Sequence, residues 1–193
     1  MKSVCIFAGS SLGVKEAYKD LAISLGQALV KNNFSMVYGG GGVGLMNEIA
    51  NEVLKYDGEV TGVITERLKD VEAGHQNLSE LYVVKTMHER KAKMAQLSDA
   101  IIPLPGGVGT WEEFFEALAW NQLGIHSKPI ILLNVEGYYD ELYSFSIKAC
   151  KEGFIPQSTL DDFYLISNVE DAIECINNFK PRDKSQWFKR LKE

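Results

Sequence analysis

The chain has 193 residues, of which 46% are hydrophobic and 24% charged, and its formal net charge is −6. This length and composition predict one globular domain that buries a full core without disulfides or metals. The acidic balance, without a basic stripe, argues against a nucleic-acid-binding protein. No apolar segment reaches the length that a bilayer span requires, so we expect no membrane partner.

The cysteines and histidines show no pattern that belongs to a metal or redox site. Cys5, Cys150 and Cys175 are widely spaced, and His75 and His126 lack metal-binding spacing to other ligand residues. The N-terminal apolar run is too short for a signal peptide and is followed by no cleavage region. We therefore expect a cytoplasmic protein without a bound metal.

Apolar runs alternate with helical patterns almost to the end of the chain. Strands are expected at residues 3–8, 35–38, 59–64, 81–85, 100–104 and 129–133, and helices at residues 15–31, 45–56, 87–97, 110–123, 138–151 and 169–179. Residues 66–79 read as an irregular connection. This order predicts an α/β fold with a doubly wound parallel sheet in a single domain, residues 1–180, followed by a charged C-terminal tail, residues 181–193.

Three loops rich in glycine or serine follow predicted strands, at residues 9–13, 39–44 and 106–110. In a doubly wound sheet, ligands bind at the carboxyl ends of the strands. We therefore expect these loops to converge on one cleft.

Residues 39–44 also match the G-x-G-x-x-G pattern, with Glu66 at a suitable distance beyond it, which raises the hypothesis of an NAD-linked oxidoreductase. However, the run follows the second strand rather than the first, and so dense a glycine run matches many patterns by accident. A loop that a phosphate or sugar approaches closely is the better interpretation.

Residues 105–113, PGGVGTWEE, are typical of a phosphate site. Gly107 and Gly109 leave backbone N–H groups accessible, and a helix that begins near Thr110 directs its positive end to the same place. Glu113 has a second interpretation, because Thr110-x-x-Glu113 fits a capping box, and the spacing alone favours that cap. Thr86-x-x-Glu89 fits the same pattern.

Arg90 and Lys91 fall in the first turns of the helix expected at residues 87–97, where cations oppose the helix dipole. Their position indicates an anionic partner nearby, although a solvated helix face explains them equally well. His88 is as suited to packing or capping as to catalysis.

Five stretches together resemble one family. GSS at 9–11, VYGGGGVGLM at 37–46, MHERK at 87–91, PGGVGTWEE at 105–113 and LGIHSKPIILLN at 123–134 are similar in order and spacing to the Lonely Guy (LOG) family of phosphoribohydrolases. The likeness runs to about Phe179. The P-G-G-x-G-T-x-x-E signature joined to M-H-x-R-K is highly specific.

The resemblance implies a Rossmann-like, homodimeric, cofactor-independent enzyme acting on a nucleoside 5′-monophosphate. Its reaction would be hydrolysis of the N-glycosidic bond of AMP and N6-substituted AMP, the cytokinin nucleotides, to free base and ribose 5-phosphate. The family's catalytic residues fall on Arg90 and Glu113, which reverses the preference for a cap at Glu113. Its substrate-binding positions fall on Ser10, Gly41, Gly44, Met87, Arg90, Lys91, Gly106, Gly107, Gly109 and Thr110.

Some features leave alternatives open. Asn47 and Thr65 depart from the family pattern beside the cleft, which bears on base preference. Members have been called lysine decarboxylases, but no pyridoxal-phosphate site is evident. A nucleotide-binding or carrier protein of this fold without hydrolysis is the alternative function. For the dimer, the sequence offers Trp120, Leu123 and Ile125 as apolar contacts, although a place in the buried core explains them equally well.

Overall fold

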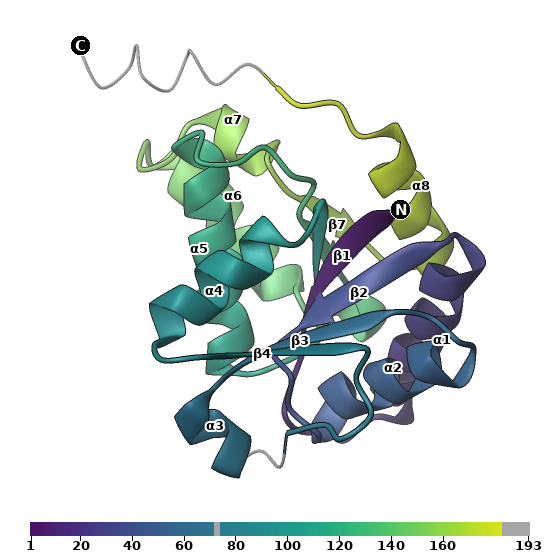
Figure 1. Ribbon diagram of the computed structural model, residues 1–193. Helices are drawn as coiled ribbons and strands as arrows, with labels where there is room; N and C mark the ends of the chain where they lie inside the picture. Colours follow the sequence, from purple (N-terminus) through teal and green to yellow (C-terminus); the bar gives the residue numbers. More distant parts are fainter. Residues whose placement is uncertain (72–73, 183–193) are drawn as a thin grey trace.

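The structure is a computed structural model that describes residues 1–71 and 74–182. A parallel sheet lies between two layers of helices (Figure 1). The strands are β1 (Lys2–Phe7), β2 (Phe34–Tyr38), β3 (Val60–Thr65), β4 (Glu80–Val84), β5 (Ala100–Pro103), β6 (Ile131–Leu133) and β7 (Tyr164–Ile166). The helices are α1 (Glu16–Lys31), α2 (Gly44–Lys55), α3 (Glu66–Val71), α4 (Met87–Gln96), α5 (Val108–Gln122), α6 (Asp140–Lys151), α7 (Gln157–Leu160) and α8 (Val169–Asn178), with a 3-10 turn, η1, at Val135–Gly137.

The strand order places β1 inside the sheet. Strands β4-β3-β2-β1-β5 are hydrogen-bonded in that order and all run parallel. A bridge from Ile101 to Ile130 leads on to the parallel pair β6-β7. The chain winds outward from β1 through β2, then returns through α4 to β5 on the other side of β1. The gap between the loops after β1 and β5 is therefore the topological switch point, where such folds bind ligands.

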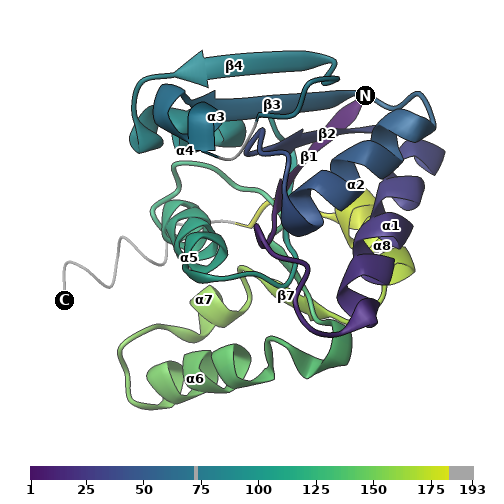
Figure 2. The same ribbon diagram turned by 90° about the horizontal axis from the view of Figure 1, so that it is seen from below.

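Each face of the sheet has its own hydrophobic core. On one face α1, α2 and α8 cover the strands, and on the other α4, α5 and α6 do so, an arrangement that Figure 2 shows from below. Because the strands are covered on both faces, they are nearly continuous apolar runs. Helix α1 shows the matching helical spacing, since Leu21, Leu25 and Leu29 recur every fourth residue and are buried.

The structure confirms the α/β doubly wound class and all six strands expected from the sequence. Four short elements were not expected: α3 lies within residues 66–79, which were predicted to be irregular, η1 precedes α6, and α7 and β7 are only four and three residues long. Most of the predicted tail, residues 183–193, lies outside the described residues. Within the described residues, none of the helices is both long and apolar enough to traverse a bilayer.

Candidate active site

The loops after β1 and β5 meet at the switch point and are held together by backbone hydrogen bonds. Gly9 N–H donates to Pro105 O at 3.1 Å, and Leu104 N–H donates to Phe7 O at 2.8 Å. Helix α2 joins them, because Leu45 N–H donates to Gly9 O at 3.0 Å. The expected convergence of the three loops is therefore present.

A cavity of about 180 Å³ opens beside this junction, and we call it the glutamate cavity. It is lined by Ala8, Gly9, Ser10, Met46, Arg90, Gly107, Val108, Gly109, Thr110 and Glu113. Six of the residues predicted from the sequence thus lie around one space: Ser10, Arg90, Gly107, Gly109, Thr110 and Glu113.

Arg90 and Glu113 form a buried ion pair between the N-terminal halves of α4 and α5. Arg90 Nη1 lies 3.1 Å from Glu113 Oε1, and the two side chains are only 8% and 11% exposed. Arg90 Nε also donates to Val63 O at 3.0 Å, so the guanidinium is anchored to strand β3. With both anchors, the arginine fixes where the carboxylate points.

Gly39 makes room for this arginine. A Cβ atom at position 39 would lie 1.9 Å from Arg90 Nη2, far inside any tolerable contact. The first glycine of the run at residues 39–44 is therefore explained by Arg90, not by a dinucleotide. No local sequence pattern indicates this contact, because the two residues lie in different segments of the fold.

The capping-box interpretation of Glu113 is wrong. Helix α5 begins at Val108 with Gly107 as its N-cap, so Thr110 is its third residue and Glu113 lies in the second turn. The capping-box interpretation is right at α4. There Glu89 N–H donates to Thr86 Oγ1 at 3.1 Å, and the Glu89 carboxylate accepts a hydrogen bond from Thr86 N–H.

The N-terminus of α5 is open. No side chain in the described part of the chain caps it, and its first turn carries no acidic residue. A Cβ atom added at Gly107 or Gly109 would meet no described heavy atom within 4 Å. These glycines therefore leave space beside N–H groups that lack intrahelical partners, which is the arrangement that binds a phosphate or carboxylate.

Lys91 contacts other carboxylates than Arg90 does. Its Nζ lies 2.5 Å from Glu112 Oε1 and 2.9 Å from Glu116 Oε1, both on α5. Burial works to lower the pKa of Lys91, but the hydrogen bonds to these carboxylates outweigh it and the pKa is raised. The anionic partners expected for Arg90 and Lys91 are thus carboxylates of α5, and Glu112 is not among the residues that line the glutamate cavity.

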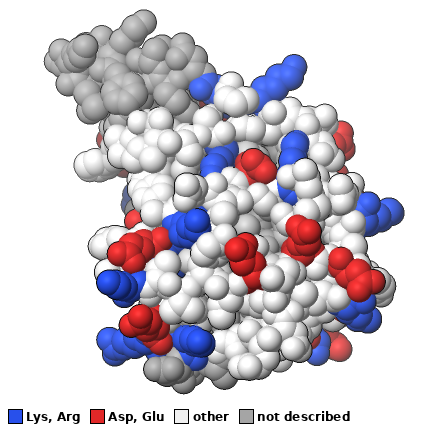
Figure 3. All heavy atoms as spheres, viewed as in Figure 1, with Lys and Arg blue, Asp and Glu red and all other residues white. Residues whose placement is uncertain are grey.

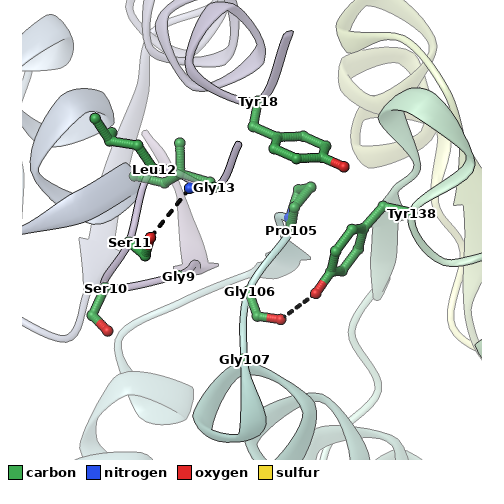
Figure 4. Close-up of a pocket in the computed structure, with 11 residues that line it drawn as sticks. Gly9, Ser10, Ser11, Leu12, Gly13, Tyr18, Pro105, Gly106, Gly107 and Tyr138 are labelled. Carbon is green, nitrogen blue, oxygen red and sulfur yellow. Dashed lines mark hydrogen bonds between the residues drawn. The ribbon is translucent and has the colours of Figure 1, made fainter. Parts of the chain in front are cut away.

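The other predicted substrate-binding residues lie outside the glutamate cavity. Gly41 accepts a hydrogen bond from Tyr38, and Gly44, with φ of +60°, packs so tightly on Ser10 that a Cβ would lie 2.3 Å from its carbonyl carbon. Met87 is 43% exposed on the first turn of α4. Gly106 faces a second, larger space of about 300 Å³ that we call the tyrosine cavity, after Tyr18 and Tyr138 in its wall (Figure 4).

Metal ligands are not gathered at either cavity. Within residues 1–71 and 74–182, no group of three His, Cys, Asp or Glu side chains is arranged to hold a metal ion. On the face in Figure 3, acidic and basic side chains alternate without forming a basic stripe. The polar groups that line the glutamate cavity include the side chains of Ser10, Arg90, Thr110 and Glu113.

Comparison with known proteins places these residues in a family. A family model described as "Possible lysine decarboxylase" matches residues 46–176. The chain is 44% identical over 191 residues to the Arabidopsis thaliana protein named cytokinin riboside 5′-monophosphate phosphoribohydrolase LOG5, covering 96% of this chain and 84% of that one. The chain belongs to the Lonely Guy (LOG) family. A LOG-family protein of the same enzyme name from Rhodococcoides fascians is 47% identical over 178 residues, covering 92% of this chain and 90% of its own.

The family assignment made from the sequence is confirmed, and the chain is an enzyme of this hydrolase family. Among solved structures, the LOG-family chain resembles the X-ray structure of TM1055, with a TM-score of 0.71 and 21% identity over 93% of this chain and 100% of that one. It also resembles the molybdenum cofactor carrier protein of Chlamydomonas reinhardtii, with a TM-score of 0.69 and 17% identity over 91% and 96% of the two chains. At these identities the likeness concerns the fold alone.

Proposed function

We propose that the chain hydrolyses the N-glycosidic bond of AMP and of N6-substituted AMP, releasing the base and ribose 5-phosphate. The observation that carries the proposal is a single oriented carboxylate, Glu113, beside an uncapped helix N-terminus. The names of the LOG relatives supply the class of reaction. The positive N-terminus of α5 and the negative Glu113 carboxylate indicate which part of the substrate each contacts.

The 5′-phosphate would lie against the N–H groups of Val108, Gly109 and Thr110, where the helix dipole favours an anion. Glu113 follows Gly109 by one helical turn, a rise of about 6 Å. That span is on the scale of a ribose ring with its 5′ carbon. A nucleotide held by its phosphate therefore extends its sugar toward Glu113.

Cleavage of the bond from C1′ to N9 builds positive charge on the sugar. Glu113 stabilises this charge and orients or deprotonates the attacking water. The water oxygen bonds to C1′, the electron pair of the broken bond leaves with the base, and the base finishes protonated. Arg90 holds the Glu113 carboxylate in place during these steps.

The proposal also includes a homodimer. Helix α5 exposes an apolar face beside the glutamate cavity, with Val108 74%, Trp111 42% and Phe115 41% accessible. Leu123 and Ile125, offered by the sequence as contacts, are 46% and 62% exposed, whereas Trp120 is half-buried. A second copy on this face would bring its own side chains toward the glutamate cavity, which Val108 also lines. Light scattering of wild type and of Trp111→Glu tests this, and a monomeric wild type refutes it.

Chromatographic detection of free base after incubation with AMP, GMP, CMP, isopentenyl-AMP and adenosine tests the activity. We expect release from AMP and isopentenyl-AMP, and poor turnover of adenosine, which has no phosphate to anchor. Glu113→Gln should abolish release. Its matched control is Glu112→Gln, because the neighbouring carboxylate is 52% exposed and faces Lys91.

Two outcomes would contradict the proposal. Equal turnover of adenosine and AMP would remove the role of the α5 N-terminus. Tight AMP binding with no adenine released by the wild type would favour the alternative, a nucleotide-binding or carrier protein. The cytoplasmic location remains a prediction, with which three free cysteines agree.

A further inference from the structure

The tyrosine cavity is lined by neither Arg90 nor Glu113, which line the glutamate cavity. It shares Gly9, Ser10 and Gly107 with the glutamate cavity, so the two spaces adjoin at the start of α5. Figure 4 shows the rings of Tyr18 and Tyr138 across from the chain at Gly9 and Gly106. Its volume of about 300 Å³ is enough for a small ring system.

Several polar groups in its wall are already hydrogen-bonded within the protein. Tyr138 donates its hydroxyl hydrogen to Gly106 O at 2.5 Å, and Gly13 N–H donates to Ser11 Oγ at 3.2 Å. Gly9 N–H is bonded to Pro105 O, and Gly9 O accepts from Leu45 N–H. The wall also contains Leu12, Tyr18, Leu45, Pro105 and the ring of Tyr138, so much of its surface is apolar or aromatic and suits an uncharged occupant.

The aromatic walls are fixed in place. The rings of Tyr18 and Tyr138 meet edge to face, with centroids 5.9 Å apart. Gly13 has φ of +73°, and a Cβ there would lie 2.7 Å from the Tyr18 ring, so glycine is required to seat that ring. Lys15 and Glu136 form an ion pair of 3.0 Å that joins the two segments carrying these tyrosines. The cavity is thus pre-formed.

The direction of the bound nucleotide determines what can enter this cavity. With the phosphate at the α5 N-terminus and C1′ near Glu113, the sugar lies in the glutamate cavity, which Tyr18 and Tyr138 do not line. Only a group attached to the phosphate itself then extends into the tyrosine cavity. Ligands with two arms and a central phosphate commonly occupy such a switch point.

We propose that the tyrosine cavity is a subsite for an aromatic group esterified to the 5′-phosphate, so that the chain binds nucleotide 5′-phosphodiesters as well as monophosphates. The inference rests on the proposed function for the position of the phosphate. It assigns Tyr18 and Tyr138 to the ester group, and it assigns Arg90 and Glu113 to the nucleoside.

Calorimetric titration of the full chain with two esters of AMP tests the subsite. Adenosine 5′-(phenyl phosphate) and adenosine 5′-(methyl phosphate) carry the same charge and differ only in the ring, and chromatography verifies that each stays intact during the titration. We expect the phenyl ester to bind about tenfold more tightly, the scale for burying one ring. Tyr18→Leu and Tyr18→Ala should remove most of this preference, whereas Tyr56→Ala, an exposed tyrosine on another surface, should keep it.

The outcomes separate this inference from the proposed function. Equal affinities of the two esters in the wild type, or a preference that survives both Tyr18 variants, overturn the subsite whether or not AMP is hydrolysed. A Tyr18-dependent preference in a chain that releases no adenine from AMP supports the subsite and refutes the hydrolase. Phenyl phosphate alone is the third probe. If its affinity is the same in wild type and the Tyr18 variants, the ring must be carried by a nucleotide. If it binds as tightly as the phenyl ester of AMP, the cavity takes a free ligand and the proposal fails.

Discussion

Replacing Gly39 with alanine tests whether the position of Arg90 controls the carboxylate of Glu113. The new Cβ would lie 1.9 Å from Arg90 Nη2, so the guanidinium must shift by about 1.5 Å to reach ordinary contact. A shift of that size breaks the 3.0 Å bond to Val63 O and the 3.1 Å bond to Glu113. We expect the free energy of unfolding to fall by about 2–4 kcal/mol and kcat on AMP to fall about 100-fold, because Glu113 loses its orientation.

Gly58→Ala is the matched control for this prediction. Its Cβ would also collide, at 2.6 Å from Val53 and 2.7 Å from Val30, but these side chains lie outside both cavities. Denaturant unfolding should show a loss of about 1–3 kcal/mol, while initial-rate assays should show kcat unchanged. Wild-type kcat in Gly39→Ala, or an equal loss of kcat in both variants, would refute the reasoning.

Further predictions follow from single contacts. Gly109→Ala should raise the free energy of unfolding by about 0.5–1 kcal/mol yet weaken AMP binding in calorimetry; unchanged affinity would remove the phosphate from α5. Tyr138→Phe should raise KM for AMP several-fold with kcat little changed, because the hydroxyl holds Gly106 O beside the phosphate loop. A several-fold fall in kcat with KM unchanged would contradict this role. Thr86→Ala should lower the free energy of unfolding measured with denaturant by about 1 kcal/mol, and an unchanged value would contradict the N-cap that Thr86 provides to α4. Burial raises the pKa of Cys5 far above neutral, so iodoacetamide at pH 8 should leave it unmodified in native protein by mass spectrometry, and labelling before unfolding would contradict its burial.

The fold was predictable because its main signals are local. The apolar runs at residues 100–104 and 129–133 indicated strands covered on both faces, and the structure places β5 and β6 there. Strand β7 was missed because three half-buried residues show no periodicity. Helix α3 was missed for a similar reason, since six mainly polar residues read as a connection.

The candidate site was predictable only in part, because its key contacts join distant segments. The spacing of Thr110 and Glu113 favoured a cap, and only the likeness to a family indicated a catalytic carboxylate. Because α5 begins at Val108, Thr110 lies inside the helix and cannot be its N-cap. The fit of Gly39 against Arg90 depends on how α4 packs on the sheet, which no local pattern records.

The position of β1 within the sheet has a consequence for biosynthesis. Val4 pairs with Met36 on one side and with Ala100 on the other. As the polypeptide leaves the ribosome, one edge of this apolar strand therefore has no hydrogen-bonding partner until β5 has been translated. A nascent chain stalled before Ala100 displays a hydrophobic edge that chaperones bind or that seeds aggregation.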